Sequence, residues 1–187
     1  MENYVYLCTL NRPTGTELNK PSRQGLNYKQ KTTMIKHYFE LICEQIRNRW
    51  DEKALTDYVD APAHATGDEQ DYTYGTMAIQ VIRLHKLFDQ LGLKAGDKIA
   101  LAGRNCANWA VAYLAVASYR GVIVSILQDF APEDICNLLK HSDAKALFVG
   151  SFIWKELKHM ENLPELEAVI SLTNFGVLRM KEQTLPM

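Results

Sequence analysis

Few of the residues that could do chemistry are spaced as catalytic or metal sites require. None of the five histidines belongs to HExxH and no serine lies in GxSxG, so neither a zinc-protease helix nor an α/β-hydrolase nucleophile is indicated. Glu133 and Asp134 are adjacent on an expected helix and point apart, which makes a poor acid–base pair. The cysteines show no CxxC pairing or zinc-ligand spacing, and we expect buried thiols in a reducing, cytoplasmic setting: Cys8, Cys43, Cys106 and Cys136.

Phosphate-binding loops are also absent from the sequence. Neither GxGxxG nor GxxxxGK[ST] occurs, and the ten glycines are scattered. Gly103-Arg104-Asn105 could bind an anion if Arg104 and free amides at a helix start held a phosphate or carboxylate. We favour the simpler interpretation, in which Asn105 caps the helix and Arg104 is solvated. From local chemistry we assign no catalytic, cofactor-binding or metal-binding residue.

The remaining chemically interesting side chains have structural explanations. His85 lies one step from the apolar stripe of its helix, so we expect it at the edge of that stripe. His141 sits at an expected helix C-terminus, where a cation is favoured. Trp154 and Met160 have the spacing of core residues.

Composition narrows the class of protein. The 187 residues are 47% apolar and 23% charged, with 21 basic against 22 acidic side chains and a net charge of −1. This excludes a disordered, collagen-like or coiled-coil chain and gives no electrostatic case for binding nucleic acid or an anionic membrane. No apolar run approaches the ~20 residues that cross a bilayer, and no secretory signal is evident.

Periodicity predicts alternating helices and short apolar strands. Helical spacing begins at Met34, and Thr73 is placed to cap a helix that ends at Gly92. Further helices are expected to begin at Asn105 or Cys106 and end at Gly121, to begin at Pro132, and to begin after a cap at Ser151. The expected strands are 54–59, 98–102, 122–127, 144–149 and 168–172.

This order predicts an α/β fold with a doubly wound, mostly parallel sheet and helices on both faces. Helix-length crossovers between short apolar strands require parallel pairing with right-handed connections. The unalternating β-branched run 122–127 favours a strand covered on both faces.

Three regions follow from the pattern. Residues 1–33 carry a net charge of +3, lack any period and are expected to be a mobile basic leader, so Met34 is a candidate for the true start. Residues 34–172 form the α/β subdomain. Residues 173–187 show no period and are expected to be an irregular tail.

An ordered series of segments resembles the N-terminal part of acyl-CoA synthetases in the adenylate-forming, AMP-binding superfamily, and most resembles the long-chain fatty acid–CoA ligases. The resemblance runs from about Met34 to Leu172. Thr76 stands where the family often has glutamate, so a reciprocal capping box is expected to be lost, and Ser125-Ile126-Leu127 replaces a common proline. The segments that carry the resemblance are 51–55, 71–74, 92–101, 105–109, 114–115, 121–122, 131–134 and 142–145.

The resemblance implies a two-step reaction. A fatty acid carboxylate reacts with ATP to give acyl-adenylate and pyrophosphate, and coenzyme A then displaces AMP. The family's phosphate loop, Mg²⁺-binding acid, ribose-binding acid and mobile lysine all lie downstream of the matched region, so ATP, Mg²⁺ and coenzyme A are implied only for the complete enzyme. Thr66-Gly67-Asp68 spells a ribose-binding motif too early in the chain, and we interpret it as coincidence.

Two functional hypotheses follow, with a weaker third. The chain is the N-terminal portion of a long-chain fatty acid–CoA ligase, predicted to be inactive alone. Alternatively, it is a non-catalytic interaction or ligand-binding module, able to self-associate through an uncovered sheet edge. The third is an unrelated doubly wound domain with an anion site near Arg104.

Overall fold

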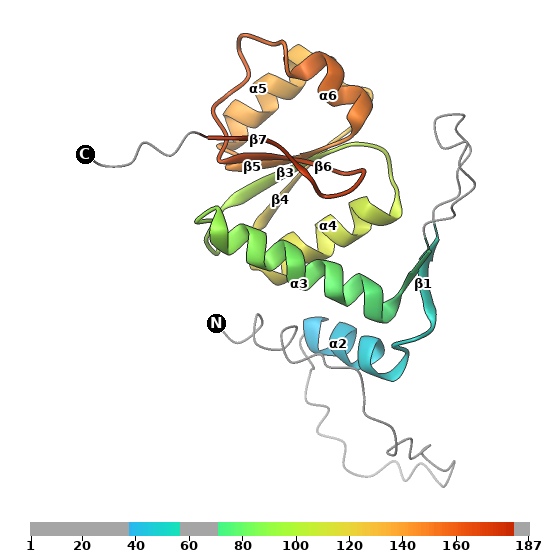
Figure 1. Cartoon of the computed structure of the whole chain (residues 1–187). Coiled ribbons are helices and arrows are strands. Elements are labelled where there is room, and N and C mark those ends of the chain that lie inside the picture. The colour runs from blue at the N-terminus through green and yellow to red at the C-terminus, as the bar shows by residue number, and fades with distance from the viewer. Residues whose placement is uncertain (1–37, 57–70, 182–187) are drawn as a thin grey trace, which may run out of the picture.

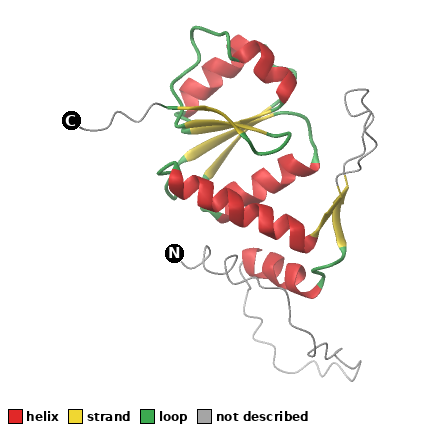
Figure 2. Cartoon of the chain, in the orientation of Figure 1, coloured by secondary structure: helices red, strands yellow, loops and turns green. Residues whose placement is uncertain are grey.

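A five-stranded sheet stands between two pairs of helices in the computed structural model, which describes residues 38–56 and 71–181 (Figures 1 and 2). A small antiparallel ribbon and one further helix precede this unit. In chain order the elements are α2 (Tyr38–Asn48), β1 (Lys53–Thr56), β2 (Asp71–Thr73), α3 (Tyr74–Gln90), β3 (Lys98–Ala102), α4 (Ala107–Ser118), β4 (Val122–Ile126), α5 (Pro132–Ser142), β5 (Ala146–Val149), α6 (Ser151–Leu157), β6 (Ala168–Ser171) and β7 (Val177–Met180).

The sheet confirms the predicted fold class. Its order is β4-β3-β5-β6-β7, with β3 parallel to β4 and β5, and β5 parallel to β6. Helices α3 and α4 cover one face, and α5 and α6 cover the other (Figure 1). The chain therefore winds outward from β3 in both directions, as a doubly wound sheet requires.

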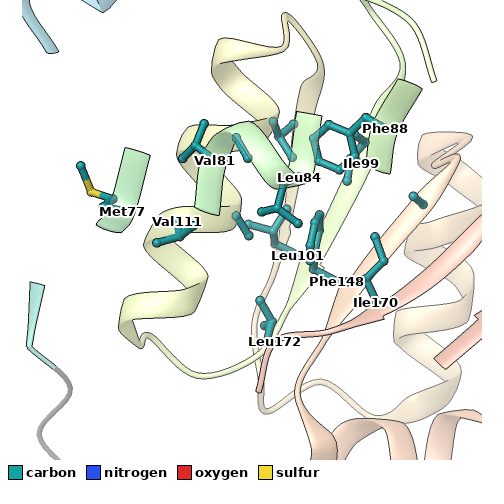
Figure 3. Close-up of a cluster of buried hydrophobic side chains, with 14 of the residues drawn as sticks. Met77, Val81, Leu84, Phe88, Ile99, Leu101, Val111, Phe148, Ile170 and Leu172 are labelled. Atoms are coloured by element: carbon teal, nitrogen blue, oxygen red, sulfur yellow. The ribbon is translucent and has the colours of Figure 1, made fainter. Parts of the chain in front are cut away.

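Alternation along β3 divides the core between the two faces. Ile99 and Leu101 join the cluster under α3 and α4, whereas Ala100 and Ala102 face the cluster under α5 and α6. Figure 3 shows the first cluster, in which the fully buried Phe88 of α3 lies near Ile99 and Phe148. Each such side chain contributes about 1.5–3 kcal/mol by leaving water, so this cluster is the main source of stability.

Strand β4 contacts the core on both faces of the sheet, as predicted: Ile123 packs against the cluster under α3 and α4, and Val124 and Ile126 pack with the cluster under α5 and α6. It is nevertheless an edge strand, and only Ile126 is buried. A run of β-branched residues favours the extended backbone without fixing how many neighbours the strand has.

Strand β7 corrects the expectation of an irregular tail. Residues 173–187 were expected to be irregular, yet Val177–Met180 pairs antiparallel with β6. The connecting turn places Phe175 in the left-handed region at φ 58°, and the Asn174 side chain accepts the Gly176 N–H at 2.9 Å. All four β7 side chains are exposed. A strand with no buried face does not need alternating apolar and polar residues, so the sequence carried no signal that predicted it.

The start of α3 both confirms and corrects the sequence analysis. Thr73 is the N-cap, and its hydroxyl accepts the Thr76 N–H at 3.1 Å. The reciprocal bond was expected to be lost, but the Thr76 hydroxyl accepts the Thr73 N–H at 2.8 Å. A threonine at this position therefore closes the capping box that glutamate usually closes.

We expect Thr73→Ala to lower the free energy of unfolding by about 1 kcal/mol, because the first turn of α3 loses its hydroxyl acceptor. Chemical denaturation of the purified chain measures this difference. The matched variant Thr76→Glu keeps an acceptor at the third helical position and should stay within about 0.5 kcal/mol of the native protein. Equal losses in both variants would contradict the capping assignment.

Two other N-caps differ from those predicted. Cys106, not Asn105, caps α4, and its sulfur accepts the Trp109 N–H at 3.4 Å. Gly150, not Ser151, precedes α6, with no side-chain cap. Thiols and glycines are weak caps, so sequence preference pointed to their polar neighbours. Pro132 opens α5 as predicted.

The ends of α3 and α4 use different residues in the left-handed region. Gly92 follows α3 at φ 70°, as expected of a helix-ending glycine. After α4 the left-handed residue is Arg120, at φ 68°, rather than Gly121. Gly121 is needed for space instead, because an added Cβ would lie 3.0 Å from Val116 Cγ1 and 3.3 Å from Asp97 O.

Several predictions fall outside the described residues. These are the leader 1–33, the helix start at Met34, the strand beyond Thr56 and the motif Thr66-Gly67-Asp68. Within 38–56 and 71–181, no helix combines the length and apolar character needed to cross a membrane.

Candidate functional site

The switch point of the sheet lies between β3 and β5, where the strand order reverses. Ligands of open α/β sheets bind in the crevice that forms there, at the carboxyl ends of the strands. Gly103 follows β3 and Gly150 follows β5, and the Gly150 N–H donates to Ala102 O at 2.9 Å. A Cβ on Gly103 would lie 2.6 Å from Leu172 Cδ1 and 3.4 Å from Gly150 N. An added Cβ at Gly103 would therefore press on the end of the Leu172 side chain, whereas one at Gly150 would lie at an ordinary contact distance of 3.6 Å from Gly103 Cα. The two loops pack closely against each other at this point.

Arg104 and Asn105 are the polar side chains closest in sequence to this crevice, and both are exposed. The favoured interpretation of Arg104 as a solvated side chain agrees with the structure. In the part of the chain that the structure describes, its side chain forms no hydrogen bond or ion pair. Arg104 can attract an anion, but a guanidinium alone supplies neither a nucleophile nor a general base.

Behind these loops, Asn108 ties three segments together. Its side-chain N–H groups donate to Leu172 O at 2.7 Å and Thr173 O at 2.9 Å. Its carbonyl oxygen accepts the Tyr72 hydroxyl at 2.6 Å. Asn108 is only 4% exposed, so these bonds are shielded from water and fix β2 and the end of β6 to the first turn of α4.

The sequence analysis missed Asn108. The usable observation was an amide in the first turn of a helix that is otherwise almost entirely apolar, because a buried amide needs partners. The partners themselves lie 36 residues before and 64 residues after it, so no local pattern identifies them.

His85 corrects the prediction that it lies at the edge of its helix's apolar stripe. The imidazole is fully buried between α3 and α4, and its Nε2 lies 3.0 Å from Ala115 O and 2.9 Å from Ser118 Oγ. The Ser118 hydroxyl donates to Leu114 O at 2.5 Å, so Nε2–H is the donor toward Ser118. Burial lowers the pKa of His85 below its ordinary value, opposed by the Ala115 carbonyl and the Asp89 charge.

An apolar groove between α2, α3 and α4 opens to solvent and encloses only about 10 Å³ of space. Ser118, the partner of His85, is its one polar lining residue among those that the structure describes. The enclosed space is about what one water molecule needs and lies far below the roughly 300–1,000 Å³ of small-molecule sites, so the groove is not a ligand pocket. Its apolar walls include Phe39, Ile42, Ile46, Met77, Val81 and Leu114.

The described residues bring no metal-ligand group together. Across 38–56 and 71–181, no three His, Cys, Asp or Glu side chains gather as a metal site would need. Burial raises the pKa values of the Cys43 and Cys136 thiols, which makes both poor nucleophiles. What these residues build is a scaffold in which the loops after β3 and β5 pack closely together.

Comparison with known proteins identifies the same scaffold elsewhere. The AMP-binding enzyme family matches residues 46–184. The rice (Oryza sativa subsp. japonica) 4-coumarate–CoA ligase 2 is 30% identical over 113 residues, which cover 58% of this chain and 19% of that enzyme. The vibriobactin-specific 2,3-dihydroxybenzoate-AMP ligase of Vibrio cholerae is 28% identical over 127 residues, 63% of this chain and 23% of that enzyme.

Solved structures give the same result for the fold. The anthranilate CoA ligase AuaEII in complex with anthranoyl-AMP aligns over 73% of this chain and 25% of its own, with TM-score 0.61 and 17% identity. Acetoacetyl-CoA synthetase from Streptomyces lividans aligns over 71% and 21%, with TM-score 0.59 and 27% identity. The chain thus spans about a fifth to a quarter of the length of the proteins it matches.

Proposed function

Because the chain belongs to the AMP-binding enzyme family, we propose that it is the N-terminal scaffold of an ATP-dependent long-chain fatty acid–CoA ligase. The sheet whose order reverses between β3 and β5 lies within the matched range, and this agreement carries the proposal. The fatty acid substrate is supported by the ordered series of segments that resembles long-chain ligases. By their names, the rice and Vibrio cholerae relatives are ligases of aromatic acids and the Streptomyces lividans structure is an acetoacetyl-CoA synthetase, so the acid must be decided by experiment.

In this proposal the 187-residue chain alone does not activate fatty acids. ATP, Mg²⁺ and coenzyme A would be held by other parts of a complete enzyme. This is supported by the described residues, which gather no group of His, Cys, Asp or Glu side chains that could hold a metal ion. We also propose a reducing, cytoplasmic location, which the free thiols of Cys43, Cys106 and Cys136 support.

We expect the purified chain, given ATP, Mg²⁺ and palmitate, to release no pyrophosphate above a protein-free blank. The rice 4-coumarate–CoA ligase 2 with 4-coumarate serves as the positive control for the assay. Palmitate-dependent release by the 187-residue chain would overturn the proposed inactivity.

The scaffold role has its own test. Residues 46–184 can replace the corresponding segment of a complete long-chain fatty acid–CoA ligase. Palmitate activation within about tenfold of the parent would support the proposal, because a correct scaffold preserves the geometry of distant catalytic groups. A folded, soluble chimaera without activation would argue against it.

A second candidate function is a non-catalytic interaction module. The observation that favours it is that both edges of the sheet are uncovered in the described structure: β4 is largely accessible and β7 is exposed throughout. Edge strands with unpaired backbone groups are templates for pairing with another strand.

A further inference from the structure

The outer edge of β4 presents backbone groups that β3 does not use. The Val122 N–H donates to Asp97 O at 2.8 Å, so the backbone N–H and C=O groups of Val122 point toward β3. The backbone groups of successive strand residues alternate in direction, so those of Val124 and Ile126 point toward β3 as well. The N–H and C=O groups of Ile123 and Ser125 point the other way, along the open edge of the sheet.

This edge lacks the features that normally prevent pairing. Residues 122–128 contain no charge, proline or glycine, and the edge is rimmed by exposed apolar side chains. Val122 is 47% exposed, Leu127 68% and Phe130 41%. The opposite edge is better protected, because β7 carries Arg179 and ends at Lys181, which pairs with Glu165 and Glu167.

Opposite charges bracket the uncharged run. Arg120 precedes β4 and Asp129 follows it, and both side chains are exposed. Within 38–56 and 71–181, neither side chain forms a hydrogen bond or an ion pair. An antiparallel partner with the same sequence would bring each positive end beside a negative end.

We propose that β4 pairs antiparallel with β4 of a second copy of this chain, about a two-fold axis at Val124. In this register Ile123 lies opposite Ser125 of the second copy, and the two exchange N–H···O=C bonds through their outward groups. Arg120 then lies opposite Gln128 of the second copy, one residue from its Asp129, twice by symmetry. The alternation fixed by Val122 permits this register, and the opposite charges come within one residue of each other in it.

The inference rests on the second candidate function, self-association through an uncovered edge, and names the edge and the partner. It is independent of the ligase proposal, which the pyrophosphate and chimaera assays test. A contact of one short strand and its rim is small, so the dimer should be weak and concentration-dependent.

Sedimentation equilibrium of the 187-residue chain, from micromolar to millimolar concentration, tests the pairing. We expect Ser125→Pro to raise the dimer dissociation constant at least tenfold, because proline removes an outward N–H and leaves the β3 ladder intact. The matched control Met180→Pro removes an N–H that faces away from β6, since the N–H of the neighbouring Lys181 donates to Glu167 O and Met180 lies on the Lys181 side of the register shift in this pairing. It should leave the dimer unchanged.

Charge reversal provides a second test that does not depend on proline tolerance. Arg120→Asp and Asp129→Arg should each raise the dissociation constant about fivefold at low salt, and the double variant should restore it to within about twofold. Aspartate also tolerates the left-handed backbone of residue 120. Dimerisation lost in Met180→Pro but kept in Ser125→Pro would overturn the β4 assignment while self-association survives. A monomer at every concentration, or no rescue by the double reversal, would overturn the inference.

Discussion

Replacing Asn108 with aspartate should lower the free energy of unfolding by about 4 kcal/mol at pH 7. The amide N–H groups that now donate to Leu172 O and Thr173 O would become a carboxylate oxygen facing two carbonyl oxygens. Because the site is 4% exposed, water cannot relieve that repulsion.

The loss should depend on pH. Burial and the two carbonyls raise the pKa of the new carboxyl above its unfolded value of about 3.9, so the folded state binds more protons than the unfolded state. The destabilisation is therefore smallest below about pH 4 and grows as pH rises through the folded pKa. Urea denaturation at pH 4.5 and pH 7.5 measures both values.

The neighbouring exposed amide provides the matched control. Asn105→Asp makes the same chemical change outside the buried network and should shift stability by less than about 0.5 kcal/mol. Tyr72→Phe removes one bond to Asn108 and should cost about 1–2 kcal/mol. A loss in Asn108→Asp that matches Asn105→Asp, or that does not vary with pH, would contradict the proposed role of this network.

The helices and strands that were predicted correctly are those whose apolar residues, caps and turns all lie within one short segment of the sequence. Strand β3 occupies 98–102 as expected, since its flanking turn and apolar run are contiguous. Helix α3 begins after Thr73 and ends before Gly92 because its cap, apolar face and terminating glycine lie within one segment. Parallel pairing followed from the helix-length crossovers.

The predictions that failed concern structural features that depend on residues far away in the sequence. The apolar run of β4 identified a strand but not its edge position, which depends on what lies beyond it. Strand β7 forms because β6 offers an open edge, and its own four residues are exposed. Arg120 rather than Gly121 takes the left-handed backbone, since Gly121 is held against Val116 and Asp97.

The candidate site was predictable only as a location. The carboxyl ends of β3 and β5 follow from the fold class, and Gly103 and Gly150 lie there. The network around Asn108 joins residues separated by 36 and 64 positions, so its chemistry emerges only after folding. The same holds for His85, whose partner Ser118 lies 33 residues away on α4.

Acidification should weaken the native protein through His85. Burial lowers the pKa of this histidine in the folded state, whereas its unfolded pKa is about 6.5, so the unfolded state binds more protons in the window below 6.5. The contribution of neutral His85 to the free energy of unfolding is fully present above pH 6.5 and is lost as pH falls toward the folded pKa. The loss approaches about 1.4 kcal/mol per pH unit in that window.

The physical cause is the environment of the ring. The imidazole lies 5.4 Å from the Tyr119 ring and 6.4 Å from the Phe88 ring, between centroids, and its Nε2 already lies near Ala115 O and Ser118 Oγ. Protonation would place a charge between α3 and α4, where the Ala115 carbonyl and the Asp89 charge offset the cost of burial only in part.

Urea titrations of the native chain, His85→Gln and His141→Gln from pH 7.5 to pH 5 separate this group from the others. His85→Gln should flatten the curve below pH 6.5, although it starts lower by about 1–2 kcal/mol because the packing around the ring is lost. His141 is exposed at the end of α5, so His141→Gln makes the same change of side chain outside the buried cluster and serves as the matched control. An unchanged slope in His85→Gln would mean that carboxyl groups, not the buried imidazole, set the acid sensitivity of the fold.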